Sequence, residues 1–345
     1  MPNVLFRCDG GPGIGIGHLM RCRSLAAAFA ALGWRHRFAV TRETVGLLRD
    51  SDPIIVPPGI DGAHAVAEAG AAIGVVCLVV DHYGLDARFE SAARGKASIV
   101  LVIDDLADQR HDCDLLVDPN PERVAADYAG RTNGATRFLL GPQYALLRPE
   151  FADHRPARAR QSRRRAERLL ITLGGADPHN ASQRLLEALP RLADSALKTL
   201  LVVGPANPHR KTLAALAPSL GVEIVVDPPD LAGLMLDADF AVSSASTSFW
   251  ELACLGVPAL VVVTADNQRA VARAAANAGA ALVLGESNRL DPRDLTTAIT
   301  ALAADPERRQ RMSDAGRKLV DGKGAERVAA AVARIISAQP QEICS

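Results

Sequence analysis

The sequence has few aromatic residues and no net charge, and both shortages narrow what the chain can be. Aromatic residues make up 4% of the 345 residues, whereas hydrophobic residues reach 48%. Because alanine, leucine and valine supply most of that share, the composition suits helices packed on buried parallel strands better than a β-sandwich. The 39 basic residues balance the 39 acidic ones, so nothing indicates a nucleic acid or an anionic membrane as partner.

Close cysteine pairs and long apolar runs are also missing. The six cysteines form no C-x-x-C pair, which favours reduced, buried thiols over a zinc site or a disulfide framework. The longest apolar stretches, such as Val75–Val80, are far too short to cross a bilayer. The first residues, MPNVLFRCDGG, lack the basic and apolar regions of a secretory signal. We therefore predict a cytoplasmic protein.

What the sequence does contain is a repeated order of short apolar run, turn and helical stretch. The predicted buried strands are rich in Val, Ile and Leu and are Val4–Cys8, Arg37–Val40, Ile54–Val56, Val75–Val80, Ser98–Ile103, Leu115–Val117, Arg168–Thr172, Leu197–Val203, Val222–Val226, Phe240–Ser243, Ala259–Val263 and Ala281–Leu284. Helical spacing is found at His18–Leu32, Asn180–Leu192, Asp230–Ala238, Ser248–Leu255, Gln268–Ala278 and Gly324–Ala338. Strands that alternate with helices predict an α/β chain with two Rossmann-like, doubly wound parallel sheets.

An arginine-rich segment separates the two halves. The stretch ADHRPARARQSRRRAER at 152–168 has seven arginines and no apolar periodicity, so we interpret it as a solvated linker in preference to a basic patch for nucleic acid. We predict an N-terminal domain at 1–152, the linker at 153–166 and a C-terminal domain at 167–323. The terminal helix and tail at 324–345 could pack on the N-terminal domain, with the residues after Ser337 frayed.

A glycine-rich loop places a histidine at the first candidate site. The run GIGIGH at 13–18 follows the first predicted strand and opens the first helix. Glycines there allow close approach to a ligand, and the helix start favours negative groups. His18 falls in the crevice where open α/β sheets bind ligands, and the positive helix end favours a neutral imidazole that can accept a proton. The alternative is that His18 caps the helix or fills a gap.

Acidic residues follow two other predicted strands of the first domain. The segment Asp81-His82-Tyr83 comes after Val80, and Asp104-Asp105 comes after Ile103. Because parallel strands end at one edge, both groups should lie at the same edge of the sheet as His18. Asp81 could orient the histidine or hold the attacking water, and Tyr83 could bind a sugar substituent; helix capping would also explain the aspartates. No histidine or second carboxylate stands at ligand spacing beside the 104–105 pair, so we predict no metal.

The second domain offers candidate anion sites. TLGGAD at 172–177 and SASTS at 244–248 each follow a predicted strand and precede a helix, where hydroxyl and N–H groups suit a diphosphate, although ordinary N-capping is the alternative. Glu251, one turn into the second helix, could hold ribose hydroxyls. Asn267 and Gln268 present amides that can both donate and accept.

Several segments in their order along the chain resemble one enzyme family. They are IGIGHLMRC, DHYGLD at 81–86, LLGPQYALLRPEF at 139–151, LITLGGADPHN at 170–180, WELACLGVP at 250–258 and ADNQ at 265–268. The chain resembles, over about residues 4–285, the UDP-2,4-diacetamido-2,4,6-trideoxy-β-L-altropyranose hydrolases of pseudaminic acid biosynthesis. Their wider relatives are two-domain glycosyltransferases of the GT-B type. The resemblance therefore implies a GT-B-like fold with two Rossmann-like domains facing a cleft.

The resemblance also implies an activity and some site residues. The family's catalytic histidine matches His18, its active-site tyrosine matches Tyr83 and its substrate-binding asparagine matches Asn267. It implies UDP held mainly by the second domain, no metal or cofactor, and water attack at the anomeric carbon with release of UDP. One stretch departs from the family pattern, because SSAST at 243–247 lacks a glycine and leaves less room for close backbone approach to a diphosphate.

Residues and resemblance together give the predicted site. The catalytic residues are His18, Tyr83 and Asp81. The residues predicted to bind the substrate are Gly15, Gly17, Arg21, Gly174, Gly175, Ser246, Thr247, Glu251, Asn267 and Gln268. The predicted partner is a small-molecule UDP-sugar, without nucleic acid or membrane. A GT-B glycosyltransferase and a UDP-sugar-binding protein without turnover are the alternatives. NAD binding is disfavoured, because the second strand is followed by Arg42 where an acidic residue should hold the ribose.

Overall fold

The chain forms two compact units, and a computed structural model describes most of both. The described residues are 1–11, 14–48, 52–158, 161–175, 177, 179–189, 197–204 and 207–338. Unit 1 consists of residues 1–149 and 323–345, and unit 2 of residues 150–322. Parts of the predictions for the glycine loop, the helix at 180–192 and the tail lie outside the described residues, as does Cys344.

Unit 1 is built on a parallel sheet of seven strands in the order β3-β2-β1-β4-β5-β6-β7. The strands are β1 (Asn3–Cys8), β2 (Arg35–Val40), β3 (Ile54–Ile55), β4 (Val75–Asp81), β5 (Ile99–Ile103), β6 (Leu115–Asp118) and β7 (Arg137–Leu140). Its helices are α1 (Gly17–Ala31), α2 (Gly62–Ile73), α3 (Ala87–Ala93) and α12 (Gly324–Ala338), with short 3₁₀ turns at Val45–Leu47, Gly59–Asp61, Ala125–Tyr128 and Pro142–Tyr144. The sequence prediction missed β7, because this edge strand offers only four residues, none of them fully buried.

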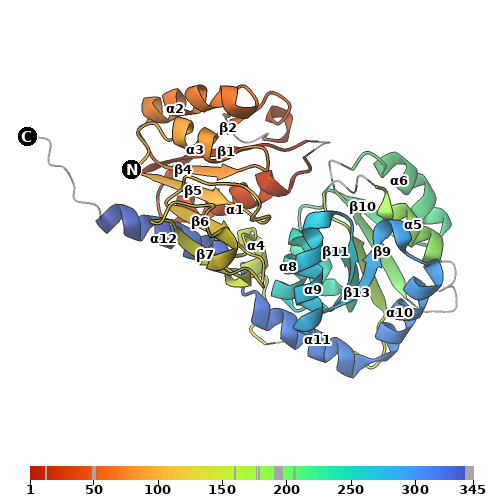
Figure 1. Cartoon of the computed structure of the whole chain (residues 1–345). Helices are drawn as coiled ribbons and strands as arrows, with labels where there is room; N and C mark the ends of the chain where they lie inside the picture. The colour runs from red at the N-terminus through yellow and green to blue at the C-terminus, as the bar shows by residue number, and fades with distance from the viewer. Residues whose placement is uncertain are drawn as a thin grey trace, which may run out of the picture. The chain divides into compact units, whose positions relative to one another are not determined.

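Side-chain alternation along the strands decides which helices cover each face of this sheet. Val4, Phe6 and Cys8 of β1 belong to a core that also contains residues of α1 and α12. Leu5, between them, points into the other core, which α2 and α3 cover. Figure 1 shows these two helix layers. Since Val332 of α12 is fully buried in the first core, the terminal helix is part of unit 1, although its sequence follows that of unit 2.

Unit 2 repeats the architecture with six parallel strands in the order β10-β9-β8-β11-β12-β13. The strands are β8 (Arg168–Thr172), β9 (Lys198–Val203), β10 (Glu223–Val226), β11 (Phe240–Ser244), β12 (Ala259–Val263) and β13 (Ala281–Glu286). The helices are α4 (Pro149–Asp153), α5 (Ala181–Ala188), α6 (Arg210–Ser219), α7 (Leu231–Asp237), α8 (Thr247–Leu255), α9 (Arg269–Asn277), α10 (Pro292–Ala304) and α11 (Pro306–Leu319), with 3₁₀ turns at Asp266–Gln268 and Ser287–Arg289. The prediction of two doubly wound parallel sheets is confirmed.

The arginine-rich segment between the sheets makes specific contacts within unit 2. The Arg155 guanidinium donates to the backbone oxygens of Cys254, at 2.7 Å, and Arg317, at 2.8 Å. The Ala166 amide donates to the Ala303 oxygen at 3.0 Å. At least part of the segment predicted as a linker is thus fastened to the C-terminal unit.

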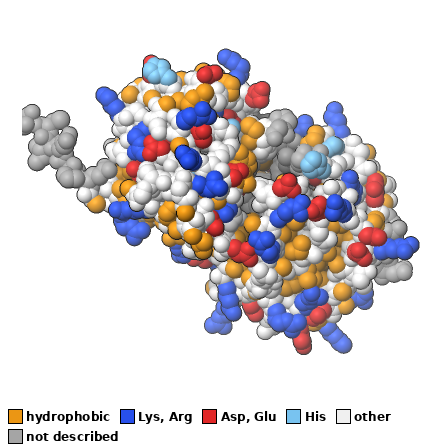
Figure 2. Space-filling model, viewed as in Figure 1, with side chains coloured by type: hydrophobic (Ala, Val, Ile, Leu, Met, Phe, Trp, Pro, Cys, Tyr) orange, Lys and Arg blue, Asp and Glu red, His pale blue; other side chains and the backbone are white. Residues whose placement is uncertain are grey.

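The surface carries charges of both signs, and the described cysteines lie inside. Figure 2 shows basic and acidic side chains interspersed over both units on the face in view. The five described cysteines are free and buried. Within the described ranges no helix has the length and apolar character needed to cross a membrane.

Candidate functional site

Strand order brings the histidine of the glycine loop next to an aspartate from distant sequence. β1 and β4 are neighbours, with Cys8 paired to Asp81 in register. The chain leaves β1, passes through the glycine loop and enters α1 at Gly17, so His18 stands at the same sheet edge at which β4 ends. Its Nδ1 atom lies 2.5 Å from Asp81 Oδ1. The imidazole is almost fully buried, at 4% exposure, and the N-cap residue of α1 is Ile16, not His18.

Arg21, one turn along α1, anchors the aspartate. Its Nε donates to Asp81 Oδ2 at 2.6 Å, and its Nη2 donates to Asp81 Oδ1 at 2.7 Å. Its Nη1 donates to Asp105 Oδ2 at 2.7 Å. Because i and i+3 positions lie on one helix face, a single turn of α1 presents both the histidine and the arginine to the end of β4. The carboxylate is therefore held from both oxygens.

The charges of this cluster fix the histidine tautomer. Burial by itself raises the pKa of Asp81, but the Arg21 guanidinium and His18 outweigh it and hold the pKa well below its usual range. An ionised carboxylate only accepts hydrogen bonds, so the 2.5 Å contact places the proton on His18 Nδ1. Arg21 Nη2 lies 3.1 Å from the same nitrogen, but its shorter contact, at 2.7 Å, is the bond that it donates to Asp81 Oδ1. A neutral His18 then has Nε2 as a proton acceptor, which is the arrangement of a general base with an orienting carboxylate.

The glycine loop and Tyr83 border this cluster. Gly11 and Gly15 exchange backbone hydrogen bonds at 2.9 and 2.7 Å, and Gly15 has φ +79°, a conformation that favours glycine. At Gly17 an added Cβ would meet no atom of the described residues within 4 Å. The Tyr83 ring is 36% exposed and stands edge-on to the His18 ring, with centroids 4.4 Å apart.

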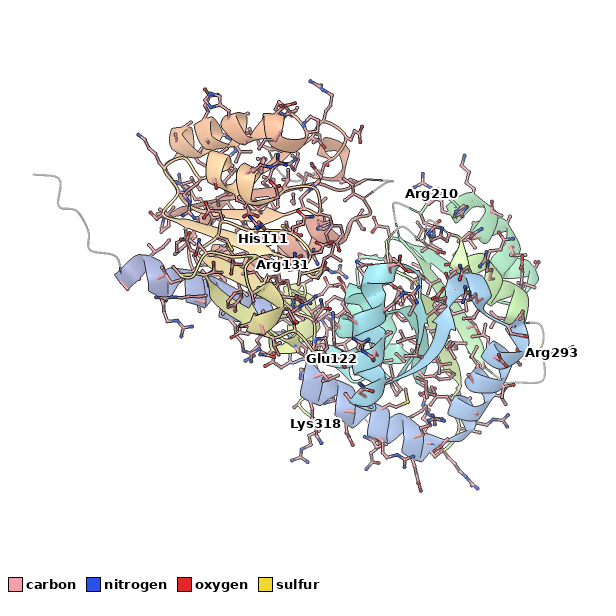
Figure 3. All side chains as sticks on the ribbon, in the orientation of Figure 1. His111, Glu122, Arg131, Arg210, Arg293 and Lys318 are labelled. Atoms are coloured by element: carbon pink, nitrogen blue, oxygen red, sulfur yellow. The ribbon has the colours of Figure 1, made fainter. Side chains whose placement is uncertain are left out.

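Asp104 belongs to a buried cluster that also contains His111 and Glu90. Its carboxylate accepts from the Leu106 and Ala107 amides at 2.9 and 3.0 Å, which closes a turn in the loop between β5 and β6, and residues 104–114 contain no helix that Asp104 could cap. It also lies 3.5 Å from His111 Nε2, while His111 Nδ1 lies 2.7 Å from Glu90. His111 is labelled in Figure 3. His111 does not stand at ligand spacing from Asp104 in the sequence, and the tertiary fold brings the two side chains together. Among the described residues, no group of three or more His, Cys, Asp or Glu side chains could hold a metal ion.

Unit 2 gathers hydroxyl groups around a glycine at its own sheet edge. β8 and β11 are neighbours, so the loop after β8 faces the loop that enters α8. A Cβ added at Gly174 would lie 3.8 Å from the hydroxyls of Ser246 and Ser248 and 3.9 Å from that of Ser244. Ser246 caps α8 by accepting from the Ser248 amide. Although SSAST has no glycine of its own, the tertiary structure places Gly174, with φ +85°, opposite it.

The other residues predicted to bind a substrate take different positions. Gly175 lies against Gly204. A Cβ added at Gly204 would come within 2.3 Å of the Gly175 Cα atom. Thr247 is the first residue of α8, and Glu251 is buried one turn later. Asn267 is exposed on the 3₁₀ turn after β12. The Gln268 side-chain oxygen accepts from the Thr264 amide at 3.0 Å, which gives this residue a structural task in shaping the turn.

Three residues beside the first cluster were not assigned a role from the sequence. Arg7 and Asp9 form a buried ion pair at 2.8 Å, and His82 Nε2 lies 3.6 Å from the same Asp9 oxygen. The sequence feature that could have indicated this group is an arginine, Arg7, inside an otherwise apolar strand.

A surface depression of about 550 Å³ lies at the opposite edge of the sheet, where the strands begin. It is lined partly by Trp34 and Arg35 and contains none of the predicted site residues.

The chain is similar to known proteins in both sequence and fold. Residues 169–328 match the glycosyltransferase family 28 C-terminal domain. Among solved structures, MurG of Acinetobacter baumannii superposes with a TM-score of 0.68 at 15% identity, covering 97% of this chain and 100% of that one. The predicted GT-B-like fold class is thereby confirmed.

Two curated proteins align over most of the chain. The spore coat polysaccharide biosynthesis protein SpsG of Bacillus subtilis is 28% identical over 333 residues, which cover 93% of this chain and 95% of that protein. The UDP-2,4-diacetamido-2,4,6-trideoxy-β-L-altropyranose hydrolase of Campylobacter jejuni is 24% identical over 270 residues, covering 78% of this chain and 94% of the hydrolase. Each alignment is longer than either unit and therefore includes residues of both.

Proposed function

We propose that this chain is an enzyme that hydrolyses a UDP-sugar, with His18 as the general base. The observation that carries the proposal is the 2.5 Å contact of His18 Nδ1 with Asp81, which leaves Nε2 as the proton acceptor. In the proposed step, Nε2 takes a proton from water as the water oxygen bonds to the anomeric carbon. The bond from that carbon to the UDP oxygen breaks, and the electron pair leaves with UDP. Such base catalysis typically contributes about 10²–10⁴-fold.

Unit 2 is proposed to bind the UDP group. The hydroxyls of Ser244, Ser246 and Ser248 lie around the Gly174 position, and the amides at the start of α8 supply partial positive charge. Donors fixed in advance can stabilise the negative charge that grows on a leaving diphosphate. Asn267, matched to the family's substrate-binding asparagine, is proposed to contact the substrate from the turn after β12.

UDP-2,4-diacetamido-2,4,6-trideoxy-β-L-altropyranose is the proposed substrate. The alignment with the Campylobacter jejuni hydrolase over 94% of its length, together with the match of His18 and Tyr83 to family positions, supports this choice. Transfer of the sugar to an acceptor is the second candidate, and the match to the family 28 glycosyltransferase domain favours it. The two reactions differ only in whether water or another hydroxyl attacks.

The decisive experiment measures UDP release from this substrate by the purified protein in ¹⁸O-labelled water, with EDTA and without any acceptor. Hydrolysis at carbon predicts UDP release with the label in the free sugar, and attack at phosphorus would label UDP instead. The matched variants are His18→Ala and His64→Ala, the latter at a histidine whose side chain is 86% exposed.

We expect His18→Ala to lower kcat by about 10²–10⁴-fold while the UDP Kd stays within a factor of two, since the UDP group is assigned to unit 2. His64→Ala should behave like wild type. Full turnover by His18→Ala would remove the base from the proposal. UDP binding without release in water, followed by release once a hydroxyl acceptor is added, would identify a transferase.

A further inference from the structure

A second series of arginine, carboxylate and histidine lies beside the first. Arg7 Nη2 stands 2.8 Å from Asp9 Oδ2, and both side chains are almost wholly buried. His82 Nε2 stands 3.6 Å from the same oxygen. The His82 and His18 ring centroids are 6.4 Å apart, with 24° between the ring planes. The two series therefore end in neighbouring imidazoles.

The second imidazole differs from the first in how its nitrogens are used. His82 Nδ1 accepts a hydrogen bond from the Gly84 amide at 2.8 Å, so the ring proton of the neutral form resides on Nε2. Burial raises the pKa of Asp9, but Arg7 and the Thr41 donors outweigh it and lower the pKa. Nε2–H consequently faces an ionised carboxylate. With both nitrogens occupied in this way, His82 is arranged as a structural element and not as a second base.

What the His82 ring holds is the turn that carries Tyr83. Two hydrogen bonds close this turn. The Gly84 N–H donates to His82 Nδ1, and the Leu85 N–H donates to the His82 backbone oxygen at 3.3 Å. A Cβ at Gly84 would stand 3.1 Å from His82 Cε1, so glycine allows the ring to approach. Tyr83 is a third exposed, yet its ring meets His18 at 4.4 Å. Fixing the Tyr83 backbone reduces the conformational freedom that its partly exposed ring must lose to stay at this position, and the Tyr83 oxygen also accepts from the Gln109 side chain.

We propose that His82, backed by Asp9 and Arg7, is a positioning residue that holds Tyr83 against His18. The inference rests on the proposed function, since it assigns the reason for the position of Tyr83 in the same site. The essential link is the acceptor at Nδ1, which closes the turn, and the contact with Asp9 steadies the ring. Small displacements of a group at a reacting centre can cost about 10²-fold in rate.

Two substitutions separate the nitrogens of His82. In His82→Asn the side-chain oxygen can replace Nδ1 as acceptor for the Gly84 amide, as in an Asx-turn, but nothing reaches Asp9. In His82→Gln the amide nitrogen can replace Nε2 near Asp9, while the short-range acceptor is lost. We expect His82→Gln to lower kcat by about tenfold or more, and His82→Asn to retain at least a third of wild-type kcat. UDP affinity should change in neither variant.

A double-mutant cycle with Tyr83→Ala distinguishes positioning from a general structural role. If His82 acts through Tyr83, His82→Gln should cost little further kcat in the Tyr83→Ala background. An undiminished loss in that background, or wild-type kcat in His82→Gln, would overturn the inference. Melting temperatures within a few degrees of wild type for both single variants exclude loss of fold as the cause.

Crystal structures of the two variants provide a readout without turnover. The Tyr83–His18 centroid distance of 4.4 Å should persist in His82→Asn and increase in His82→Gln. If the distance is the same in both, the inference fails, whatever the wild-type protein catalyses. If wild type releases no UDP but the rings move as expected, the positioning stands and only the proposed reaction is lost.

Discussion

Replacing Asp81 by asparagine tests the part of the site that sets the base. Both carboxylate oxygens accept from Arg21, at 2.6 and 2.7 Å, and Oδ1 also accepts from His18. An asparagine must therefore place its NH₂ group against an Arg21 donor in either amide orientation. If the NH₂ group faces His18, it forces the ring proton to Nε2 and removes the acceptor. If the oxygen faces His18, the tautomer survives but the negative charge that stabilises the imidazolium is gone.

The expected magnitudes follow from these contacts. Either orientation should lower kcat by about 10²–10⁴-fold, which corresponds to about 3–5 kcal/mol in activation free energy. Breaking a buried ion pair by removing one charge typically costs about 3–5 kcal/mol of stability. Because Arg21 keeps its 2.7 Å bond to Asp105, we expect the lower end, about 3 kcal/mol. For a domain of this size that loss is about 6–12 °C in melting temperature.

The assay compares Asp81→Asn with Asp105→Asn, which also removes one carboxylate from Arg21 but none from His18. UDP release is measured at a temperature at least 15 °C (roughly the expected shift with a margin) below the lower melting temperature. We expect both variants to lose stability and only Asp81→Asn to lose more than tenfold in kcat. Equal kcat in the two folded variants would refute the argument that Asp81 sets the tautomer and charge of the base.

Two further predictions concern other parts of the molecule. Ser246→Ala and Asp291→Ala each remove a helix N-cap, and each should lower the free energy of unfolding, followed by thermal melting, by about 1 kcal/mol. Calorimetry should show weakened UDP binding only for Ser246→Ala. Equal UDP affinity of the two variants would place the diphosphate elsewhere. For His111, burial lowers the pKa but Asp104 and Glu90 raise it to about 9. Since this lies above the unfolded value of about 6.5, the stabilisation is complete below pH ~6.5 and disappears as the pH rises through about 9. The stability gap between wild type and His111→Gln, about 3 kcal/mol at pH 6, should thus close by pH ~10, and a gap independent of pH would contradict the assignment.

The sequence determined the elements and the edge at which the chemistry occurs. Short runs such as Val75–Val80 are too apolar to lie anywhere but inside a parallel sheet, and they alternate with helical periods. His18 and Asp81 each follow a strand, and parallel strands end at a common edge, so both were placed at that edge from local pattern alone. β7 was not predicted because an edge strand with one exposed and three half-buried residues has little hydrophobic signal.

Only the tertiary structure decided which residues meet. The neighbouring positions of β1 and β4 bring His18 to Asp81, and those of β8 and β11 bring Gly174 to Ser246; strand order depends on how whole βα units pack, which no local pattern states. The same holds for α12, whose Val332 enters the unit 1 core although unit 2 precedes it in sequence. Local spacing sets each residue's face and edge, whereas burial of complete faces selects the partners, because that free energy is shared among residues distant along the chain.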